Sequence, residues 1–150
     1  MVIEISTDKI WGILKTIPDP EIPEISIVDL GIIRDVQYDN QFTITITPTY
    51  IGCPAMSFIK EEIIYNMELQ GVINYQVKTS LAPPWTTDWM SDAVKTKLKD
   101  AGIAPPSKNV ICPQCDSIEV EVISNFGSTA CKALYKCLSC AEPFHHFKQF

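Results

Sequence analysis

The stretch Phe42-Thr-Ile-Thr-Ile-Thr47 alternates strictly between apolar and polar side chains. Successive side chains of a β-strand point to opposite faces, so this alternation predicts a strand with one face on a core. A second strand is compatible with residues 32–38, and Asp39-Asn40 supplies turn residues between the two. We therefore expect a pair of strands joined by a turn.

Helical patterns lie on both sides of this strand pair. A first helix, capped by Ser6 or Thr7, is expected to run to about Ile17, with apolar side chains on one face. The sequence after the pair predicts a helix opening at Pro54, a strand over residues 72–79, and a helix from Ser91 to Asp100. This order predicts an α+β fold, a small two-layer α/β sandwich, for residues 1–104.

The composition is that of an ordinary globular protein, with 150 residues, 46% of them hydrophobic, and a net charge of −6. An acidic chain repels phosphate backbones, and the C-terminal segment has no excess of basic residues, so we expect no nucleic-acid partner. No apolar run reaches the ~18–20 residues of a membrane span, and the N-terminus has no signal-peptide pattern. We therefore expect no membrane partner and a cytoplasmic location, where cysteines are more often metal ligands or reactive thiols than disulfides.

Cysteines crowd into the C-terminal part of the chain. Cys112-Pro-Gln-Cys115 and Cys137-Leu-Ser-Cys140 are separated by the 21 residues 116–136, one more than the ~15–20 typical of zinc ribbons. The two-residue spacing lets both thiolates of a motif reach one metal ion, and two motifs complete a tetrahedral set of four sulfur ligands. We therefore predict a structural zinc bound by Cys112, Cys115, Cys137 and Cys140. They would form a zinc ribbon over residues 108–150, with Pro105-Pro106-Ser107 as the linker.

The residues alone leave other interpretations of this segment open. Four buried thiols without a metal, or a four-cysteine site for iron or an iron–sulfur cluster, would have the same spacing. Cys131 can be buried, replace a ligand or form a disulfide, and we favour burial or contact with a partner because two complete motifs already supply four ligands. His145 and His146 are weaker ligand candidates, since adjacent histidines are more often surface or partly packed groups.

Cys53 is a second candidate site. It stands just before the predicted helix start at Pro54, where free N–H groups and the helix dipole favour a thiolate. The acidic, proline-rich loop with Asp19, Glu21 and Glu24 can offer carboxylates to a transient metal. A capping or buried cysteine beside a stiff loop fits the same residues equally well.

Several longer motifs resemble known families. Three segments resemble the iron–sulfur assembly domain family that includes SufT: Asp19-Pro-Glu-Ile-Pro23, Ile27-Val-Asp-Leu-Gly-Ile-Ile33 and Pro48-Thr-Tyr-Ile-Gly-Cys-Pro-Ala-Met56. Two more resemble the PaaD-like family of accessory subunits of phenylacetyl-CoA epoxidase systems: Ala82-Pro-Pro-Trp-Thr-Thr-Asp-Trp-Met90 and Phe126-Gly-Ser-Thr-Ala-Cys-Lys-Ala-Leu-Tyr135. The resemblance covers nearly the whole chain, from about Trp11 to Phe150.

The resemblance implies a role in aerobic phenylacetate catabolism, namely the maturation or insertion of an iron–sulfur or iron centre in an epoxidase complex. The implied partners are the oxygenase and reductase components of that complex and the iron–sulfur assembly machinery. The resemblance assigns cofactor binding to Cys53, Asp19 and Glu21, with a transient iron or iron–sulfur cluster as the cofactor. The alternative is a non-catalytic structural subunit of the same multicomponent oxygenase.

The residues do not indicate catalysis by the chain itself. A di-iron oxygenase needs two Glu-x-x-His motifs, and Glu142-Pro-Phe-His145 fits the pattern once. The proline within it and the lack of a second copy argue against a di-iron site. The scattered glycines form no nucleotide or phosphate loop. We therefore expect an accessory subunit of a phenylacetyl-CoA monooxygenase, without catalytic residues of its own.

Overall fold

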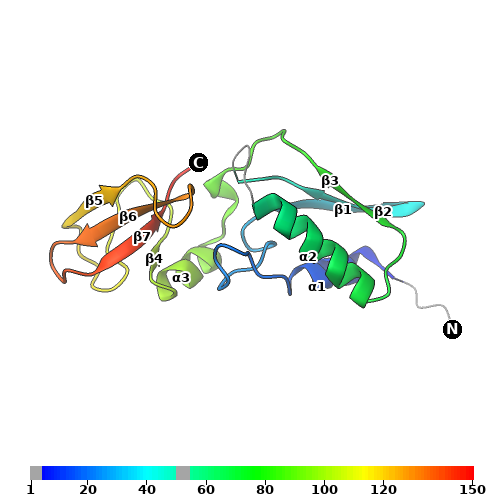
Figure 1. Cartoon of the computed structure of the whole chain (residues 1–150), viewed down its shortest axis with the longest axis horizontal. Coiled ribbons are helices and arrows are strands. Elements are labelled where there is room, and N and C mark those ends of the chain that lie inside the picture. Colours follow the sequence, from blue (N-terminus) through cyan, green and yellow to red (C-terminus); the bar gives the residue numbers. More distant parts are fainter. Residues whose placement is uncertain (1–4, 50–54) are drawn as a thin grey trace. The chain divides into compact units, whose positions relative to one another are not determined.

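The chain forms two compact units. The computed structural model describes residues 5–49 and 55–150, which Figure 1 shows in colour. Unit 1 ends at Trp85 and unit 2 runs from Thr86 to Phe150. Among the described residues, no helix is long and apolar enough to cross a membrane.

Unit 1 has the predicted α+β order. Its elements are α1 (Thr7–Leu14), β1 (Ile33–Asp39), β2 (Gln41–Ile46), α2 (Ala55–Leu69) and β3 (Tyr75–Thr79). The strands form a sheet in the order β1-β2-β3, with β1 antiparallel to β2 and β3 parallel to it. The parallel pair requires a crossover, which α2 provides between β2 and β3 (Figure 1). The predicted fold class is therefore confirmed.

The core of unit 1 lies between the sheet and the two helices. In β2, Phe42, Ile44 and Ile46 are buried while the threonines between them are partly exposed, as the alternating sequence predicts. The helices contribute buried apolar side chains at helical spacing: Ile10, Ile13 and Leu14 from α1, and Ile59, Ile63 and Met67 from α2. Helix α1 contacts both α2 and β1, so the helices and the sheet enclose one apolar layer.

The connection between α1 and β1 is a further part of this core. Its prolines prevent regular structure, yet the segment buries six apolar side chains: Ile17, Ile22, Ile25, Ile27, Leu30 and Ile32. The Trp85 indole N–H donates a buried hydrogen bond to the carbonyl of Leu30 at 2.9 Å. The loop is therefore fixed in place by packing, and it carries Asp19 and Glu21 on a rigid backbone.

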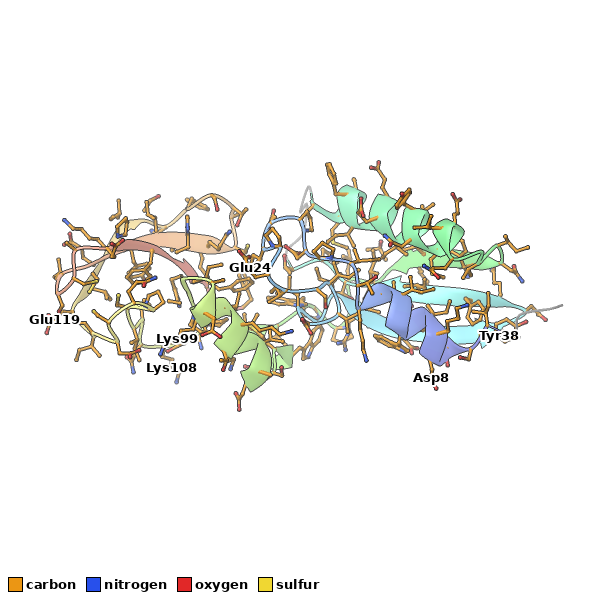
Figure 2. The ribbon with its side chains drawn as sticks, turned by 90° about the horizontal axis from the view of Figure 1, so that it is seen from below. Asp8, Glu24, Tyr38, Lys99, Lys108 and Glu119 are labelled. Carbon is orange, nitrogen blue, oxygen red and sulfur yellow. The ribbon has the colours of Figure 1, made fainter. Side chains whose placement is uncertain are left out.

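Unit 2 is a four-stranded sheet with one helix. Its elements are the 3₁₀ turn η1 (Thr87–Trp89), α3 (Asp92–Asp100), β4 (Ile103–Ala104), β5 (Val120–Ser124), β6 (Lys132–Cys137) and β7 (Pro143–Phe147). The strand order is β4-β7-β6-β5, with the short β4 parallel to β7 and the other pairs antiparallel. Figure 2 shows Lys99 and Lys108 on this unit, on either side of β4 in the sequence.

The division between the units differs from the predicted boundary at Pro105-Pro106-Ser107. Residues 103–104 pair with His145 and His146 of β7, and α3 contacts β4. The ion pair between Lys99 of α3 and Asp116, at 2.7 Å, lies within the same unit. These contacts connect α3 and the prolines to the ribbon strands within unit 2, and the predicted boundary at residues 105–107 stays a prediction.

The first and last residues of unit 2 are joined by hydrogen bonds. The carbonyl of Phe150 accepts from the Thr86 hydroxyl at 2.7 Å and from the Thr87 amide at 3.1 Å. The amide of Phe150 donates to the Thr87 hydroxyl at 3.2 Å. The Thr86-Thr87-Asp88-Trp89 motif thus anchors the end of the chain, with Thr86 also capping η1.

Candidate metal centre

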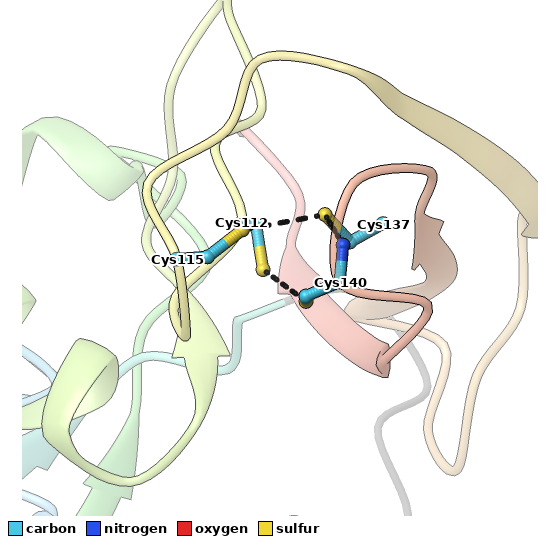
Figure 3. Close-up of side chains that lie close together, drawn as sticks. All are labelled: Cys112, Cys115, Cys137 and Cys140. Atoms are coloured by element: carbon cyan, nitrogen blue, oxygen red, sulfur yellow. Dashed lines mark hydrogen bonds between the residues drawn. The ribbon is translucent and has the colours of Figure 1, made fainter.

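Four cysteine side chains from two turns converge in unit 2. The sulfur atoms of Cys112, Cys115, Cys137 and Cys140 all lie within 4.8 Å of one another (Figure 3). The distance between the sulfurs is 3.7 Å for Cys112 and Cys140, and 3.5 Å for Cys115 and Cys137. Each close pair takes one sulfur from each motif, so the folded hairpins bring the two CxxC turns together face to face.

The backbone of each turn aims its sulfurs inward. In the first turn, the Asp116 amide donates to the Cys112 carbonyl at 3.0 Å and the Gln114 amide to the Cys112 sulfur at 3.4 Å. In the second, the Cys140 amide donates to the Cys137 sulfur at 3.4 Å. The residue after each motif, Asp116 or Ala141, has a positive φ, 61° and 66° respectively. Both turns therefore end with the same left-handed backbone step.

The crowded thiols differ in their tendency to ionise. The Cys140 amide lowers the pKa of Cys137 to about 6, because it stabilises the thiolate that accepts its hydrogen bond. At Cys115 the Ser117 amide acts in the same direction, but the neighbouring thiols, led by Cys137, together with partial loss of hydration outweigh it and raise the pKa of Cys115 to about 12. The four-cysteine cluster therefore loses a first proton readily and a second with difficulty. A bound cation would favour the loss of further protons by taking their place.

The arrangement fits a tetrahedral metal ion. A zinc ion with four sulfur ligands at ~2.3 Å requires sulfur–sulfur separations of about 3.8 Å. The two close pairs are near this value, and the remaining sulfurs are within 4.8 Å. A divalent metal ion would also offset about half of the negative charge of four thiolates.

The packing around the cysteines is thin. Cys112 and Cys137 are buried, whereas Cys115 and Cys140 are exposed. The buried pair belongs to a small apolar cluster with Ala104 and Phe144, with Val110, Val120 and Tyr135 packed against it. So small a core contributes little stability on its own, and a bound metal would supply much of the rest.

The other cysteine and histidine candidates of unit 2 lie outside the cluster. Cys131 is buried, as expected, and its sulfur lies 3.0 Å from the Thr129 hydroxyl. His145 accepts a hydrogen bond at Nε2 from the Ser128 amide at 3.4 Å. His146 is also buried. Within residues 5–49 and 55–150, the group of metal-binding side chains close enough to share one ion is the four-cysteine cluster.

The second predicted site is described only in part. Cys53 lies outside the described residues. Asp19 is buried, and its Oδ1 accepts hydrogen bonds from the amides of Glu21 and Ile22, both at 2.9 Å. Asp19 thus organises the proline-rich loop, and the partly exposed Glu21 follows it on the same turn. That these two carboxylates meet Cys53 stays a prediction.

Two features of the cluster escaped the sequence analysis. The hydroxyls of Ser117 and Ser139 are 2.7 Å apart and join the two turns. Asp116 and Ala141 adopt a backbone conformation that glycine usually provides. Asp116 and Ala141 each follow the second cysteine of a motif, and this shared position is the signal for their backbone conformation. Ser117 follows its motif whereas Ser139 lies inside its own, so the sequence gives no comparable signal for their contact.

Comparisons with known proteins match both units. The family described as "Iron-sulfur cluster assembly protein" matches residues 7–77, and the "PaaD zinc beta ribbon domain" matches residues 99–148. An alignment of 150 residues with a protein from Escherichia coli (strain K12), provisionally named as a subunit of 1,2-phenylacetyl-CoA epoxidase, has 46% identity. It covers 93% of this chain and 91% of that protein.

Relatives that match only part of the chain are also found. An "Fe-S protein maturation auxiliary factor" from Porphyromonas gingivalis (strain ATCC BAA-308 / W83) is 37% identical over 94 residues, covering 61% of this chain and 89% of that protein. The crystal structure of a domain of unknown function, DUF59, from Bacillus anthracis superimposes with a TM-score of 0.55 and 33% identity. It covers 61% of this chain and 89% of that chain. Since the match to the Escherichia coli protein spans both the assembly-type unit and the cysteine ribbon, the chain belongs to the PaaD-like family.

Proposed function

We propose that the chain is an accessory protein of aerobic phenylacetate catabolism that matures or inserts an iron–sulfur or iron centre in a phenylacetyl-CoA epoxidase complex. The observation that carries this proposal is the 46% identity, over both units, to a protein named as an epoxidase subunit. The likeness of unit 1 to iron–sulfur protein maturation factors supports the maturation step. The partners would be the oxygenase and reductase components and the iron–sulfur assembly machinery.

The ribbon has a structural task in this proposal. One zinc ion is held by Cys112, Cys115, Cys137 and Cys140, and it fixes the two turns of unit 2. A structural ion with four protein ligands has no open position for substrate, so the ribbon contributes shape for docking a client. The support is the closed set of sulfur ligands and the match to a zinc ribbon family.

The transient cargo is assigned to unit 1. Cys53 would hold iron or a cluster, with Asp19 and Glu21 as nearby carboxylates, and pass it to the client. The rigid loop that carries both carboxylates supports a fixed position for them. Soft thiolate and hard carboxylate ligands together suit an iron ion that is bound and then released.

A second candidate function is a non-catalytic structural subunit of the oxygenase, which the word "subunit" in the relative's name favours. A deletion strain separates the two functions. Maturation predicts normal amounts of oxygenase and reductase polypeptides with a low content of iron and labile sulfide. It also predicts that fully metallated partners turn over substrate without this chain. A structural subunit predicts partners with full metal content that need the chain for turnover, and this result would refute maturation.

Variants at cysteines test the site within the same strain. Cys53→Ser should leave the partners poor in iron, while Cys131→Ser, which changes a buried thiol outside the metal cluster, should restore them. A Cys53→Ser protein that restores both iron content and growth on phenylacetate would remove Cys53 from the site. The deletion experiment would still decide between maturation and a structural role.

A further inference from the structure

One edge of the sheet in unit 1 is open. Strand β3 is the last in the order β1-β2-β3, so β2 pairs with one of its sides and the other side is the sheet edge (Figure 1). The carbonyl of Asn74 and the amide of Ser80 bond to β2. Because the backbone groups of successive residues in a strand point to opposite sides, Tyr75, Val77 and Thr79 direct theirs to the open edge. These three residues are therefore placed to pair with a further strand.

A groove of about 440 Å³ lies beside this edge, between β3 and α2. The apolar side chains in it are poorly covered, since Ile73 is 92% exposed and Ile64 is 40% exposed. Exposed apolar side chains beside an open strand edge favour association with another polypeptide. The described residues that line the groove are Lys60, Ile64, Glu68, Ile73, Tyr75, Gln76 and Val77.

The α2 side of the groove has charges of opposite sign at its two ends. Lys60, Ile64 and Glu68 follow one another at intervals of four residues, so they form one stripe on the helix. Burial and the nearby charge of Glu68 raise the pKa of Tyr75, which places Glu68 at the Tyr75 end of the groove. Lys60 precedes Glu68 by two helical turns, or about 12 Å. The apolar Ile64 lies midway between the two charges.

This stripe is complementary to a second copy of itself. When two α2 helices lie antiparallel about a two-fold axis at Ile64, Lys60 of each copy faces Glu68 of the other. The two Ile64 side chains then meet at the axis. One stripe thus supplies both partners of each ion pair, which is the property of a surface that binds its own copy.

The strand edge has the same symmetry. Neighbouring antiparallel strands are related by a two-fold axis perpendicular to the sheet. An axis at Val77 places the two Val77 residues opposite each other and Tyr75 opposite Thr79 of the second copy, so all three outward-directed residues are paired. Lys78 then faces the neutral Gln76 of the second copy and not another lysine. With this axis, both α2 helices lie on the same face of the joined sheet.

We propose that two copies of this chain associate through their β3 edges, so that two three-stranded sheets form one continuous sheet with the two α2 helices antiparallel on its face. A second copy fits better than an unrelated partner, because the charges on α2 and the outward-directed residues of β3 are both symmetric about a central apolar residue. This inference does not depend on the proposed function.

The test uses the full-length, zinc-loaded protein. Analytical ultracentrifugation from micromolar to submillimolar concentration should show a reversible equilibrium between monomer and dimer. Amide hydrogen exchange at the two ends of this range locates the contact. The amides of Tyr75, Val77 and Thr79 should gain protection as the dimer forms, whereas those of Gln76 and Lys78, which already bond to β2, should change little.

Charge variants test the symmetry of the surface. Lys60→Glu and Glu68→Lys each place like charges opposite each other twice, so each variant alone should weaken dimerisation by about tenfold or more. An equal mixture of the two variants should form heterodimers of nearly wild-type affinity, because every charge then faces its opposite. Glu62→Lys is the matched control, since Glu62 is an exposed residue of α2 that does not line the groove.

Several results would overturn the proposal. They are a wild type that is monomeric at every concentration, or a dimer in which the three outward-directed amides of β3 gain no protection. Weakening by Glu62→Lys equal to that by Lys60→Glu would also contradict it, as would a mixture of the two variants that associates no better than either alone. Binding of a different protein at the β3 edge of a chain that stays monomeric would assign the groove to that partner and refute self-association.

Discussion

One oxygen of Asp19 accepts hydrogen bonds from the amides of both Glu21 and Ile22 in a buried loop. Asp19→Ala removes this acceptor and leaves two amides without it, so we expect a loss of about 2–4 kcal/mol in the free energy of unfolding of unit 1. Asp19→Asn keeps an oxygen acceptor and should cost clearly less. Denaturant unfolding followed by tryptophan fluorescence measures both variants. Equal stability of the alanine variant and the wild type would contradict the role of Asp19 in the loop.

The contrast between these variants also separates structure from metal binding. An amide is a poor ligand for iron compared with a carboxylate. If Asp19 holds iron, Asp19→Asn should be stable yet deficient in delivering iron to the partners. If the Asp19→Asn variant is stable and fully active, Asp19 stabilises the loop and does not bind iron.

The buried ring of His146 makes stability depend on pH. Its pKa is lowered in the folded chain, chiefly by burial, so the unfolded chain binds a proton more readily once the pH falls below about 6.5. The free energy of unfolding should therefore decrease on acidification below that pH and be unaffected by this group above it. The free energies of unfolding of the wild type and of His146→Asn are compared between about pH 5.5 and 7.5. Their difference isolates the effect of His146, because both proteins contain the same zinc ligands and His145. If the free energies of unfolding of the two proteins change with pH in the same way, the His146 ring titrates alike in the folded and unfolded chain.

Among the elements, the two cysteine turns store backbone strain. Ala141 has a φ of 66°, a conformation that costs an alanine roughly 1–2 kcal/mol and glycine almost none. Ala141→Gly should raise the midpoint of thermal unfolding of zinc-loaded unit 2 by a few degrees, corresponding to about 1 kcal/mol. Ala130→Gly, at an exposed loop position without a positive φ, is the matched control and should not stabilise. A lower midpoint for Ala141→Gly would show that the turn is not strained.

The sequence predicts elements well where the pattern is local. Alternation identifies β2, the turn residues Asp39-Asn40 support its neighbour β1, and apolar spacing or a capping serine identifies α1, α2 and α3. The first helix is shorter than predicted because the amides of Thr16 and Ile17 bond to residues three positions back, which ends the α-helical pattern after Leu14. Helix α1 therefore keeps its apolar face but not its full predicted length.

Elements that depend on distant partners could not be predicted. Strand β4 has two residues and exists because it pairs with His145 and His146 some forty positions later. Strand β7 begins with proline and contains two histidines, so it lacks the usual composition of a strand. The cysteine spacing, by contrast, predicts the convergence of all four sulfurs, because a metal site imposes its own geometry on the chain.

For the whole molecule, metal removal tests where the units divide. A strong zinc chelator should unfold unit 2, including α3, and leave unit 1 folded, because α3 contacts β4 and each unit is compact by itself. Amide hydrogen exchange reads this directly: residues 92–100 should lose protection while the amides of β2 keep theirs. Cys137→Ser should have the same effect as the chelator, and Cys131→Ser should retain zinc.

Other outcomes of this exchange experiment have clear meanings. Continued protection of α3 after zinc removal would place the division at residues 105–107, as the proline pattern predicts. Loss of protection in β2 together with α3 would show that the two units unfold as one.

The hydrogen bonds between Phe150 and the threonines at 86 and 87 have a consequence for protein engineering. Because the first and last residues of unit 2 are hydrogen-bonded to each other, joining these ends would close a short loop at little entropic cost. The unit is thus suited to circular permutation, with new termini opened in the exposed segment around Asn125. The same geometry would let unit 2 be inserted into a surface loop of another protein without forcing that loop apart.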